Sequence, residues 1–272
     1  MTGTQVLRCP ICAGPFTVDP RSWRCTSGHA FDLGREGYAN LLPVQHKHSR
    51  EPGDTAQSLA ARRAFLDAGH YAPLRDALAS MVARSHHLLD IGCGEGYYTA
   101  ALAPLAGTVI GIDIAKPAVR MAARRHPGPT WIVGSGARLP IADASIDTVC
   151  TLFTPLHPAE TVRVLGLDGD VIVATPAEAH LQALRAALFE RVEPHVPEKF
   201  REAFAPELMC VEQREIRYPL ALSAAALAQL LDMTPYAWKA RPERRAALQA
   251  TDGLETEAAF MLMRFRRRAS AR

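Results

Sequence analysis

The stretch that most constrains this chain is LLDIGCGEGYYT, which runs from Leu88 to Thr99. An apolar run typical of a buried strand ends in an acid, three glycines follow at alternate positions, and two tyrosines come next. In an open parallel sheet, the turn after the first strand must let a ligand approach the backbone closely, and glycines permit that approach. The stretch therefore predicts a ligand-binding edge.

The rest of the chain predicts an α/β fold. Short apolar runs alternate with helical stretches, which is typical of a parallel sheet with helices on both faces. The last strands are expected to close the sheet with an antiparallel edge. The expected strands are 87–91, 109–113, 131–133, 147–152, 170–174, 211–218 and 257–265, and the expected helices are 55–68, 73–84 and 223–231.

The spacing of the glycines limits which class of ligand the edge can bind. The wider G-x-G-x-x-G order that seats a pyrophosphate is absent, which argues against a nicotinamide or flavin cofactor. Asp113 ends the next strand, 23 residues after Asp90, where a carboxylate can accept both hydroxyls of a ribose. We therefore expect a nucleoside without phosphates. Alternatively, Asp90 caps its turn and Asp113 caps the helix that begins near residue 116.

Cysteines crowd the start of the chain. Cys9 and Cys12 form one close pair, and Cys25 and His29 form a second pair after twelve intervening residues. Two such pairs are the ligand set of a tetrahedral zinc ion, and four protein ligands leave no open position for catalysis. We expect a structural zinc. The alternative is three reduced, unliganded cysteines beside a surface histidine.

Charge and hydropathy bear on partners and location. Residues 1–50 hold six Lys or Arg against three acids, in a chain of net charge +3, which permits phosphate contact. The segment 38–54 gathers Lys47 and Arg50 with His46 and His48, and it is interpreted as a basic connector. No apolar run is long enough to cross a bilayer, and no signal peptide is evident, so we expect a cytoplasmic protein without membrane contact.

The glycine turn and the acid at 113 together resemble the S-adenosylmethionine (SAM) site of class I methyltransferases. With the zinc module in front, the chain resembles the 23S rRNA guanine-N1 methyltransferases. This resemblance rests on CPIC…CTSGHAFDLGREGYANLLPVQHKHSREPGD, RRAFLDAGHYAPLRDAL, LLDIGCGEGYYT and MTPYAWKARPE. It implies a Rossmann-like sheet, SAM as cofactor and methylation of N1 of one guanine in a 23S rRNA hairpin, and it leaves a homodimer open.

The resemblance also implies a set of cofactor contacts. Asp90 would orient the methionine ammonium, Asp113 would hold the ribose, and Ile114 would lie against the adenine. Many class I enzymes bind the adenine amino group with an acid after the third strand, but residues 133–139 hold none, so Ser135 or a backbone amide would substitute. The implied cofactor residues are Tyr71, Asp90, Gly92, Cys93, Gly94, Glu95, Asp113, Ile114, Ser135, Leu139 and His180. Two of these residues have an alternative role that stays open. Tyr71 would instead pack in the core, and His180 would instead lie on the surface of a helix.

The substrate is expected at the segment after the fourth strand. Phe153 would stack on the target guanine, while Tyr236 and Trp238 would wall the pocket unless they pack in the core. Guanine N1 carries a proton that must leave before or during attack, so a general base is expected. The catalytic base is not assigned: His157 is the one candidate, with a bystander role as the alternative.

The sequence divides into three expected segments, and two other functions are considered beside rRNA methylation. Residues 1–40 are interpreted as a zinc-binding RNA-recognition module, 41–80 as a basic connector with helices, and 81–272 as a SAM-dependent methyltransferase domain. The first rival is a zinc-containing RNA-binding or SAM-sensing protein without catalysis. The second rival is a small-molecule methyltransferase.

Overall fold

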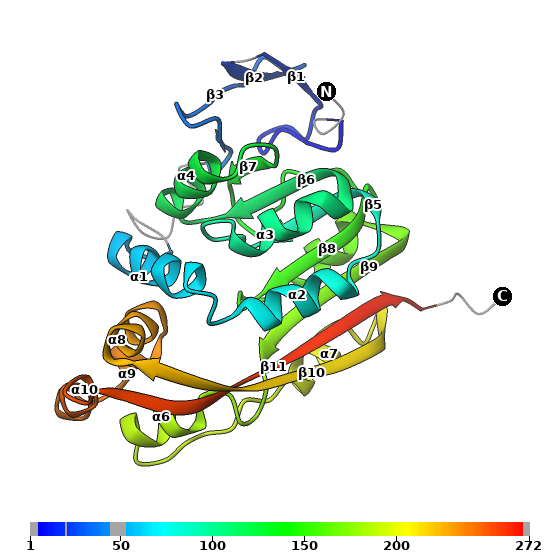
Figure 1. Ribbon diagram of the computed structural model, residues 1–272. Coiled ribbons are helices and arrows are strands. Elements are labelled where there is room, and N and C mark those ends of the chain that lie inside the picture. Colours follow the sequence, from blue (N-terminus) through cyan, green and yellow to red (C-terminus); the bar gives the residue numbers. More distant parts are fainter. Residues whose placement is uncertain (1–4, 20, 44–52, 269–272) are drawn as a thin grey trace.

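A computed structural model describes residues 5–19, 21–43 and 53–268. Most of the expected basic connector, residues 44–52 with Lys47 and Arg50, lies outside the described residues. The described chain forms one eight-stranded sheet flanked by helices and one three-stranded sheet near the N-terminus (Figure 1). The helices found in these ranges are not long and apolar enough to cross a membrane.

The large sheet has the order β10-β11-β9-β8-β5-β6-β7-β4. Its central strands are parallel, and β11 lies antiparallel between β9 and β10, so the expected antiparallel edge is confirmed. The order reverses between β5 and β8, which is the point where such sheets bind ligands. The strands are β4 (Ala39–Asn40), β5 (Ser85–Ile91), β6 (Ala106–Asp113), β7 (Thr130–Val133), β8 (Ile146–Leu152), β9 (Leu165–Pro176), β10 (Leu208–Ser223) and β11 (Gly253–Arg267).

The expected helices are also present, with one boundary shifted. Thr55 caps α1 by accepting a hydrogen bond from the Ser58 amide. α2 ends at Met81 rather than at 84 because Val82 takes an extended backbone that leads into β5. Several short helices were not expected, since seven residues are too few to show a helical period. The helices are α1 (Ala56–Asp67), α2 (Ala72–Met81), α3 (Tyr97–Leu102), α4 (Lys116–Arg125), α5 (Pro158–Val164), α6 (Gln182–Leu188), α7 (Glu198–Phe204), α8 (Ala224–Met233), α9 (Tyr236–Lys239) and α10 (Pro242–Gln249).

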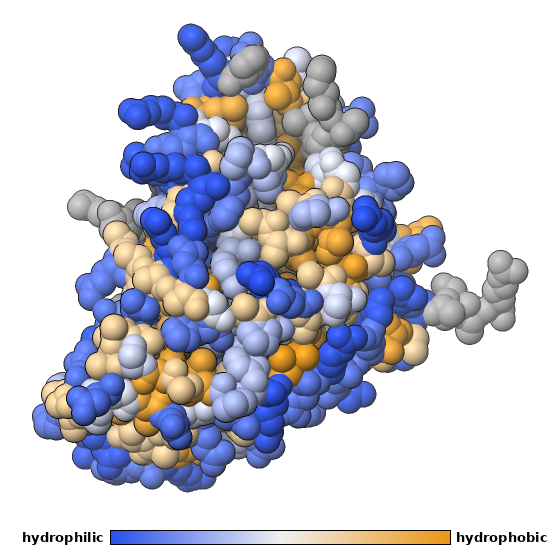
Figure 2. Space-filling view, in the orientation of Figure 1, coloured by the Kyte–Doolittle hydropathy of each residue, from blue (hydrophilic) through white to orange (hydrophobic). Residues whose placement is uncertain are grey.

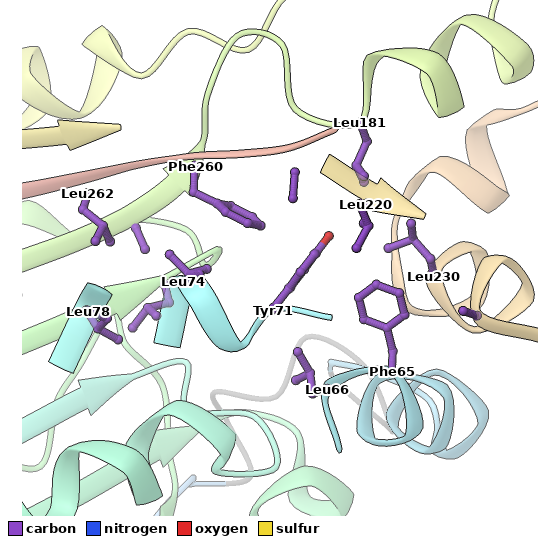
Figure 3. Packing of buried hydrophobic residues seen from close by; sticks show 14 of the residues in the cluster. Phe65, Leu66, Tyr71, Leu74, Leu78, Leu181, Leu220, Leu230, Phe260 and Leu262 are labelled. Carbon is purple, nitrogen blue, oxygen red and sulfur yellow. The ribbon is translucent and has the colours of Figure 1, made fainter. Parts of the chain in front are cut away.

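Successive strand residues pack on opposite faces of the sheet. Leu88 and Ile172 join a buried cluster with α1, α2, α6 and α8, part of which appears in Figure 3. Their neighbours Leu89 and Val173 join a second cluster with α5 and α7. Alternate side chains of a strand point to opposite faces, so both faces of this sheet are covered and the expected fold class is confirmed.

The N-terminal segment forms a small antiparallel sheet, β1 (Phe16–Val18), β2 (Ser22–Cys25) and β3 (Ala30–Asp32). This sheet is docked on the large one. Leu7 forms an antiparallel bridge with Ile141, and Trp23 is buried in the second cluster. The chain then adds β4 to the edge of the large sheet beside β7. The N-terminal segment is therefore fixed to the large domain by backbone pairing as well as by apolar contact.

Candidate functional site

Asp90, the penultimate residue of β5, is a buried carboxylate with 2% of its surface exposed. One oxygen, Oδ2, accepts a hydrogen bond of 2.5 Å from the Thr99 hydroxyl on α3. The other oxygen, Oδ1, is buried and has no hydrogen-bond partner among the residues that the structure describes. An unpartnered buried acceptor costs free energy, so this oxygen fits a donor supplied by a ligand.

The turn after Asp90 is tightly enclosed. Gly92 has φ +76°, and a Cβ atom on it would lie 2.7 Å from the side chain of Thr154, in the loop after β8. Gly94 has φ +55°, and its amide donates a 2.9 Å hydrogen bond to Oδ2 of Asp113. These positions need glycine because the backbone is left-handed and, at Gly92, because no space remains for a side chain.

Asp113 joins the ends of two elements. Besides the Gly94 amide, its carboxylate accepts a 2.8 Å hydrogen bond through Oδ1 from the amide of Ala115, just before α4. The helix cap considered as an alternative from the sequence is not found, because Ala115 is the N-cap of α4 and no side chain caps that helix. An ionised carboxylate has about four acceptor positions, so two remain for other donors. The ribose role of Asp113 stays a prediction that this geometry permits.

Three acidic groups crowd this edge. Burial, together with the nearby charges of Asp113 and Glu95, raises the pKa of Asp90 to about 7, although the Thr99 hydrogen bond opposes the rise. Burial also raises the pKa of Glu95, against the positive charge of Arg62. Burial likewise raises the pKa of Asp113, against the hydrogen bonds from Ala115 and Gly94. The three carboxyl groups are short of positive charge.

SAM fits this donor set. Its sulfonium and ammonium groups outweigh its one carboxylate, so the molecule would bring net positive charge to the three acids, and its ammonium would supply a donor for Oδ1 of Asp90. Cys93 and Ile114 belong to one apolar cluster beside the turn, which suits an adenine face. We therefore assign the edge as the place where SAM fits, while the role of each residue stays a prediction.

Two polar contacts of this edge were not expected from the sequence. Thr99 lies nine residues after Asp90, and no local signal marks it as the partner of the carboxylate. Arg62 on α1 forms a 2.5 Å ion pair with Asp54, and its Nη1 atom is 3.7 Å from where a Cβ atom on Gly94 would lie. Nothing in the local sequence places α1 over the glycine turn, because helix packing decides that contact.

Of the residues predicted to contact the adenine, only some are free to do so. The hydroxyl of Ser135 accepts a hydrogen bond from the Ala137 amide, which still leaves its own proton to donate. Leu139 is 4% exposed and packs with Leu7 and Ile141 in the second cluster, while its amide binds Glu160. No acid follows β7, in agreement with the sequence.

Tyr71 belongs to the first buried cluster, and its ring centroid lies 6.2 Å from that of His180. Figure 3 shows the Tyr71 ring among Phe65, Leu220 and Phe260, with its hydroxyl directed away from α2. Its contact with cofactor is untested, since packing alone also accounts for this burial. His180 is 5% exposed, and its Nδ1 accepts a hydrogen bond from the amide of Ala259, so the helix-surface alternative is wrong. Burial, and then the charges of His195 and Arg185, lower the pKa of His180 to about 3.

Phe153 stands at the end of β8 with φ +55° and 46% of its surface exposed. A positive φ is strained for a bulky residue and is often found at functional sites. Its ring lies 6.4 Å from that of Tyr98 and 5.6 Å from that of Phe260, measured between centroids. Tyr98 has a buried hydroxyl without a hydrogen-bond partner in the described chain, which the sequence did not flag.

The other predicted substrate residues lie elsewhere. Tyr236 forms a 3.0 Å hydrogen bond between its hydroxyl and His195, and Trp238 is 68% exposed, so core packing is wrong for Trp238. His157 is the N-cap of α5 and lies close to the turn after β7. Its ring would be 2.9 Å from a Cβ atom on Gly136. No described contact joins His157 to Phe153.

Cys9, Cys12, Cys25 and His29 come together in the small sheet. Their ligand atoms all lie within 4.8 Å of one another, and the Sγ atoms of Cys12 and Cys25 are 3.5 Å apart. Four ligands about 2.0–2.3 Å from a tetrahedral zinc ion would lie roughly 3.3–3.8 Å from each other, so the donor set fits zinc. Hydrogen bonding by Ser27 and Gly14 lowers the pKa of Cys12 to about 6, which favours the thiolate that a metal needs.

Comparison with known proteins gives matches to both parts of the chain. Residues 7–50 match the family described as "RlmA, N-terminal", and residues 89–167 match the family "Methyltransferase domain". The 23S rRNA (guanine(748)-N(1))-methyltransferase of Streptomyces fradiae is 37% identical over 89% of each chain. A relative from Micromonospora griseorubida carries a provisional name for a 23S rRNA guanine-N1 methyltransferase and is 35% identical over 96% of this chain and 97% of its own.

Solved structures agree on the architecture of the large domain. A protein of unknown function from Deinococcus radiodurans superimposes with a TM-score of 0.50 at 17% identity, over 72% of this chain and 86% of its own. At that identity the likeness concerns the fold alone. Together with the match to the methyltransferase-domain family, the strand order identifies the large sheet as a class I methyltransferase sheet, and the zinc-ribbon match covers the four metal ligands.

Proposed function

The chain belongs to the RlmA family of 23S rRNA guanine-N1 methyltransferases, and from this premise we propose that it methylates N1 of one guanine in a 23S rRNA hairpin, with SAM as methyl donor. The name of the Streptomyces fradiae relative specifies guanine 748, so the equivalent guanine is the first target to test. The observation that carries the proposal is the correspondence over nearly the full length with 23S rRNA guanine-N1 methyltransferases, in a chain that joins a zinc ribbon to a SAM-type edge.

The residues of the edge suggest how the chain would prepare the reaction. SAM supplies an electrophilic methyl group. The carboxylates of Asp90 and Asp113 would hold opposite ends of the cofactor, which fixes the direction of the methyl group. Phe153 would stack on the target base beside the same edge. Holding two reactants in line can supply up to about 7–11 kcal/mol of the barrier reduction in well-oriented systems, so positioning would be the main contribution.

Two steps must precede methyl transfer. Guanine N1 lies inside a base pair in a duplex, so the base must be unpaired or flipped, at a cost of a few kcal/mol that a hairpin loop lowers. The N1 proton must also leave. His157 is kept as the candidate acceptor, and replacing it with Asn should then lower kcat for methyl transfer while SAM affinity stays unchanged. An unchanged kcat would exclude His157.

We extend the proposal to several finer points. Tyr71, His180 and Ser135 would complete the cofactor site, and Tyr236 and Trp238 would wall the base. Residues 1–40, 41–80 and 81–272 would act as recognition module, connector and catalytic domain. The chain would act in the cytoplasm on rRNA, and a homodimer is testable by light scattering on the purified protein. A single-chain mass would exclude the dimer.

Primer extension tests the main proposal directly. N1 methylation blocks base pairing, so reverse transcriptase should stop beside one guanine of 23S rRNA from cells that carry the gene and should read through in cells that lack it. Purified protein with SAM and the hairpin RNA should form S-adenosylhomocysteine. SAM binding without product would favour the sensor, and product formation without RNA would favour a small-molecule methyltransferase.

A further inference from the structure

Helix α4 carries a row of cations on its exposed face. Its buried residues are all small or apolar, namely Ala118, Val119, Ala122 and Ala123. Lys116, Arg120 and Arg124 are exposed and are spaced four residues apart, so they lie on one side of the helix over about 12 Å. The helix contains no acid. The row, called the α4 row below, consists of these three residues.

Two cations of the α4 row have no acidic partner, whereas arginines in other basic clusters form ion pairs. At the end of β11, Arg264 and Arg266 pair with Glu212 and Asp170. In α10, the arginines pair with Glu190 and Asp232. By contrast, Lys116 and Arg124 make no ion pair with any residue in the described ranges, and Arg120 pairs only with Glu36.

Helix stability does not explain this row. Like charges four residues apart repel each other, and Lys116 lies at the helix N-terminus, where the helix dipole favours acids. No acid stands in the first turn to offset these effects. A row that opposes local stability is consistent with selection for binding a polyanion.

The row lies between the two parts of the proposed RNA site. Lys116 follows Asp113 by three residues, so α4 starts at the cofactor edge. Arg120 forms a 2.7 Å ion pair with Glu36, in the segment between β3 and β4. Figure 1 shows α4 next to the N-terminal module, and Figure 2 shows hydrophilic surface over both. A strand of RNA that touches the module and enters the edge would pass α4.

We propose that the α4 row binds the phosphate backbone of the rRNA next to the target hairpin. This inference rests on the proposed function and adds a second RNA contact, on the catalytic domain, to that of the zinc module. Cations that contact phosphates release counterions, so each contact adds about 0.7–0.9 to the slope of log K against log salt concentration. The contacts would position the hairpin without reading its bases.

The test compares two double variants of equal charge loss. Lys116→Gln with Arg124→Gln removes the two unpaired cations of the row and leaves the Arg120–Glu36 pair intact. Arg214→Gln with Arg217→Gln is the matched control, because these arginines pair with Glu212 and Glu215 on β10. Binding of the hairpin RNA is measured by fluorescence anisotropy at several salt concentrations, with SAM affinity and zinc content as checks.

The α4 variant should lower the salt slope by about 1.4–1.8 and weaken RNA binding about tenfold or more, with SAM affinity unchanged. The control should keep the wild-type slope. Equal slopes in wild type and the α4 variant, or equal losses in both variants, would overturn the inference. A wild type that neither binds nor methylates the hairpin would instead overturn the proposed function. Glu36→Gln frees Arg120 and should leave the slope unchanged or make it steeper.

Discussion

The Thr99 hydroxyl donates a 2.5 Å hydrogen bond to Oδ2 of Asp90, and Oδ1 of the same buried carboxylate is left without a partner in the described part of the chain. Thr99 thereby orients a charged group that burial would otherwise disfavour, since its hydrogen bond lowers the pKa of Asp90 while burial raises it. The pair gives the cofactor edge one fixed hydrogen-bond acceptor.

SAM affinity should depend on pH near neutrality. The pKa of Asp90 is about 7 in the ligand-free protein, and a bound cation favours the ionised form. Below pH 7, binding must therefore expel a proton, and the Kd should rise about tenfold per pH unit down to the lower pKa of the bound state. Calorimetry between pH 5 and 8.5 measures this. Asp90→Asn should flatten the profile, and a flat wild-type profile would contradict the prediction.

Thr99→Val should weaken SAM binding mainly at neutral pH. The substitution keeps the shape of the side chain but removes the hydrogen bond, so the pKa of Asp90 should rise further and less of it is ionised at pH 7. We expect about threefold weaker binding at pH 7, since losing about 1 kcal/mol of stabilisation would lower the ionised fraction of Asp90 from about one half to about one sixth. Affinity should recover toward the wild-type value at pH 9. A loss that is the same at both pH values would show a packing effect.

Asp113→Ala should raise the Kd for SAM by roughly 10- to 100-fold, because charge-assisted hydrogen bonds contribute about 1.5–3 kcal/mol. The variant also loses the bonds to the Gly94 and Ala115 amides, so thermal unfolding is followed in parallel. Asp113→Asn preserves the size of the side chain and one of its two acceptor oxygens, so its structural loss should be smaller than that of the alanine variant. RNA affinity should change little, and an unchanged SAM affinity would exclude the ribose role.

Phe153→Ala should slow methyl transfer without affecting SAM binding. Stacking of a base on an aromatic ring contributes about 1–3 kcal/mol, so kcat/KM for the hairpin should fall roughly 5- to 100-fold. Removing the exposed ring leaves no cavity in the core, because 46% of the side chain faces solvent. Phe153→Tyr keeps the ring and should keep most of the activity. Full activity of the alanine variant would place the base elsewhere.

Cys9→Ser should release zinc and impair RNA binding, while SAM binding persists. The four ligands hold the small sheet together, but the cofactor edge consists of residues from β5, β6 and α3. Metal content is measured by atomic absorption and SAM affinity by calorimetry. Treatment of the wild type with a chelator should reproduce the result. One zinc per chain in the variant would contradict the ligand set.

Local sequence was enough to predict the features that depend on neighbours in the chain. The apolar run before Asp90 and the run before Asp113 predicted adjacent parallel strands, and parallel strands bring their carboxyl ends to one edge. The same holds for the zinc ligands, since two close pairs need only one turn each to present their side chains. The fold class followed from these patterns, whereas the family was inferred from the resemblance of several longer stretches of sequence.

Tertiary structure alone decided the contacts between distant segments. Arg62 reaches the Gly94 turn from α1, Phe260 of β11 lies beside Phe153 of β8, and Leu7 pairs with Ile141 so that the zinc module is docked on the sheet. No periodicity specifies such partners, because the same apolar face of a helix or strand can pack in several ways. Only the closely packed interior selects one arrangement, and with it the surroundings of the site.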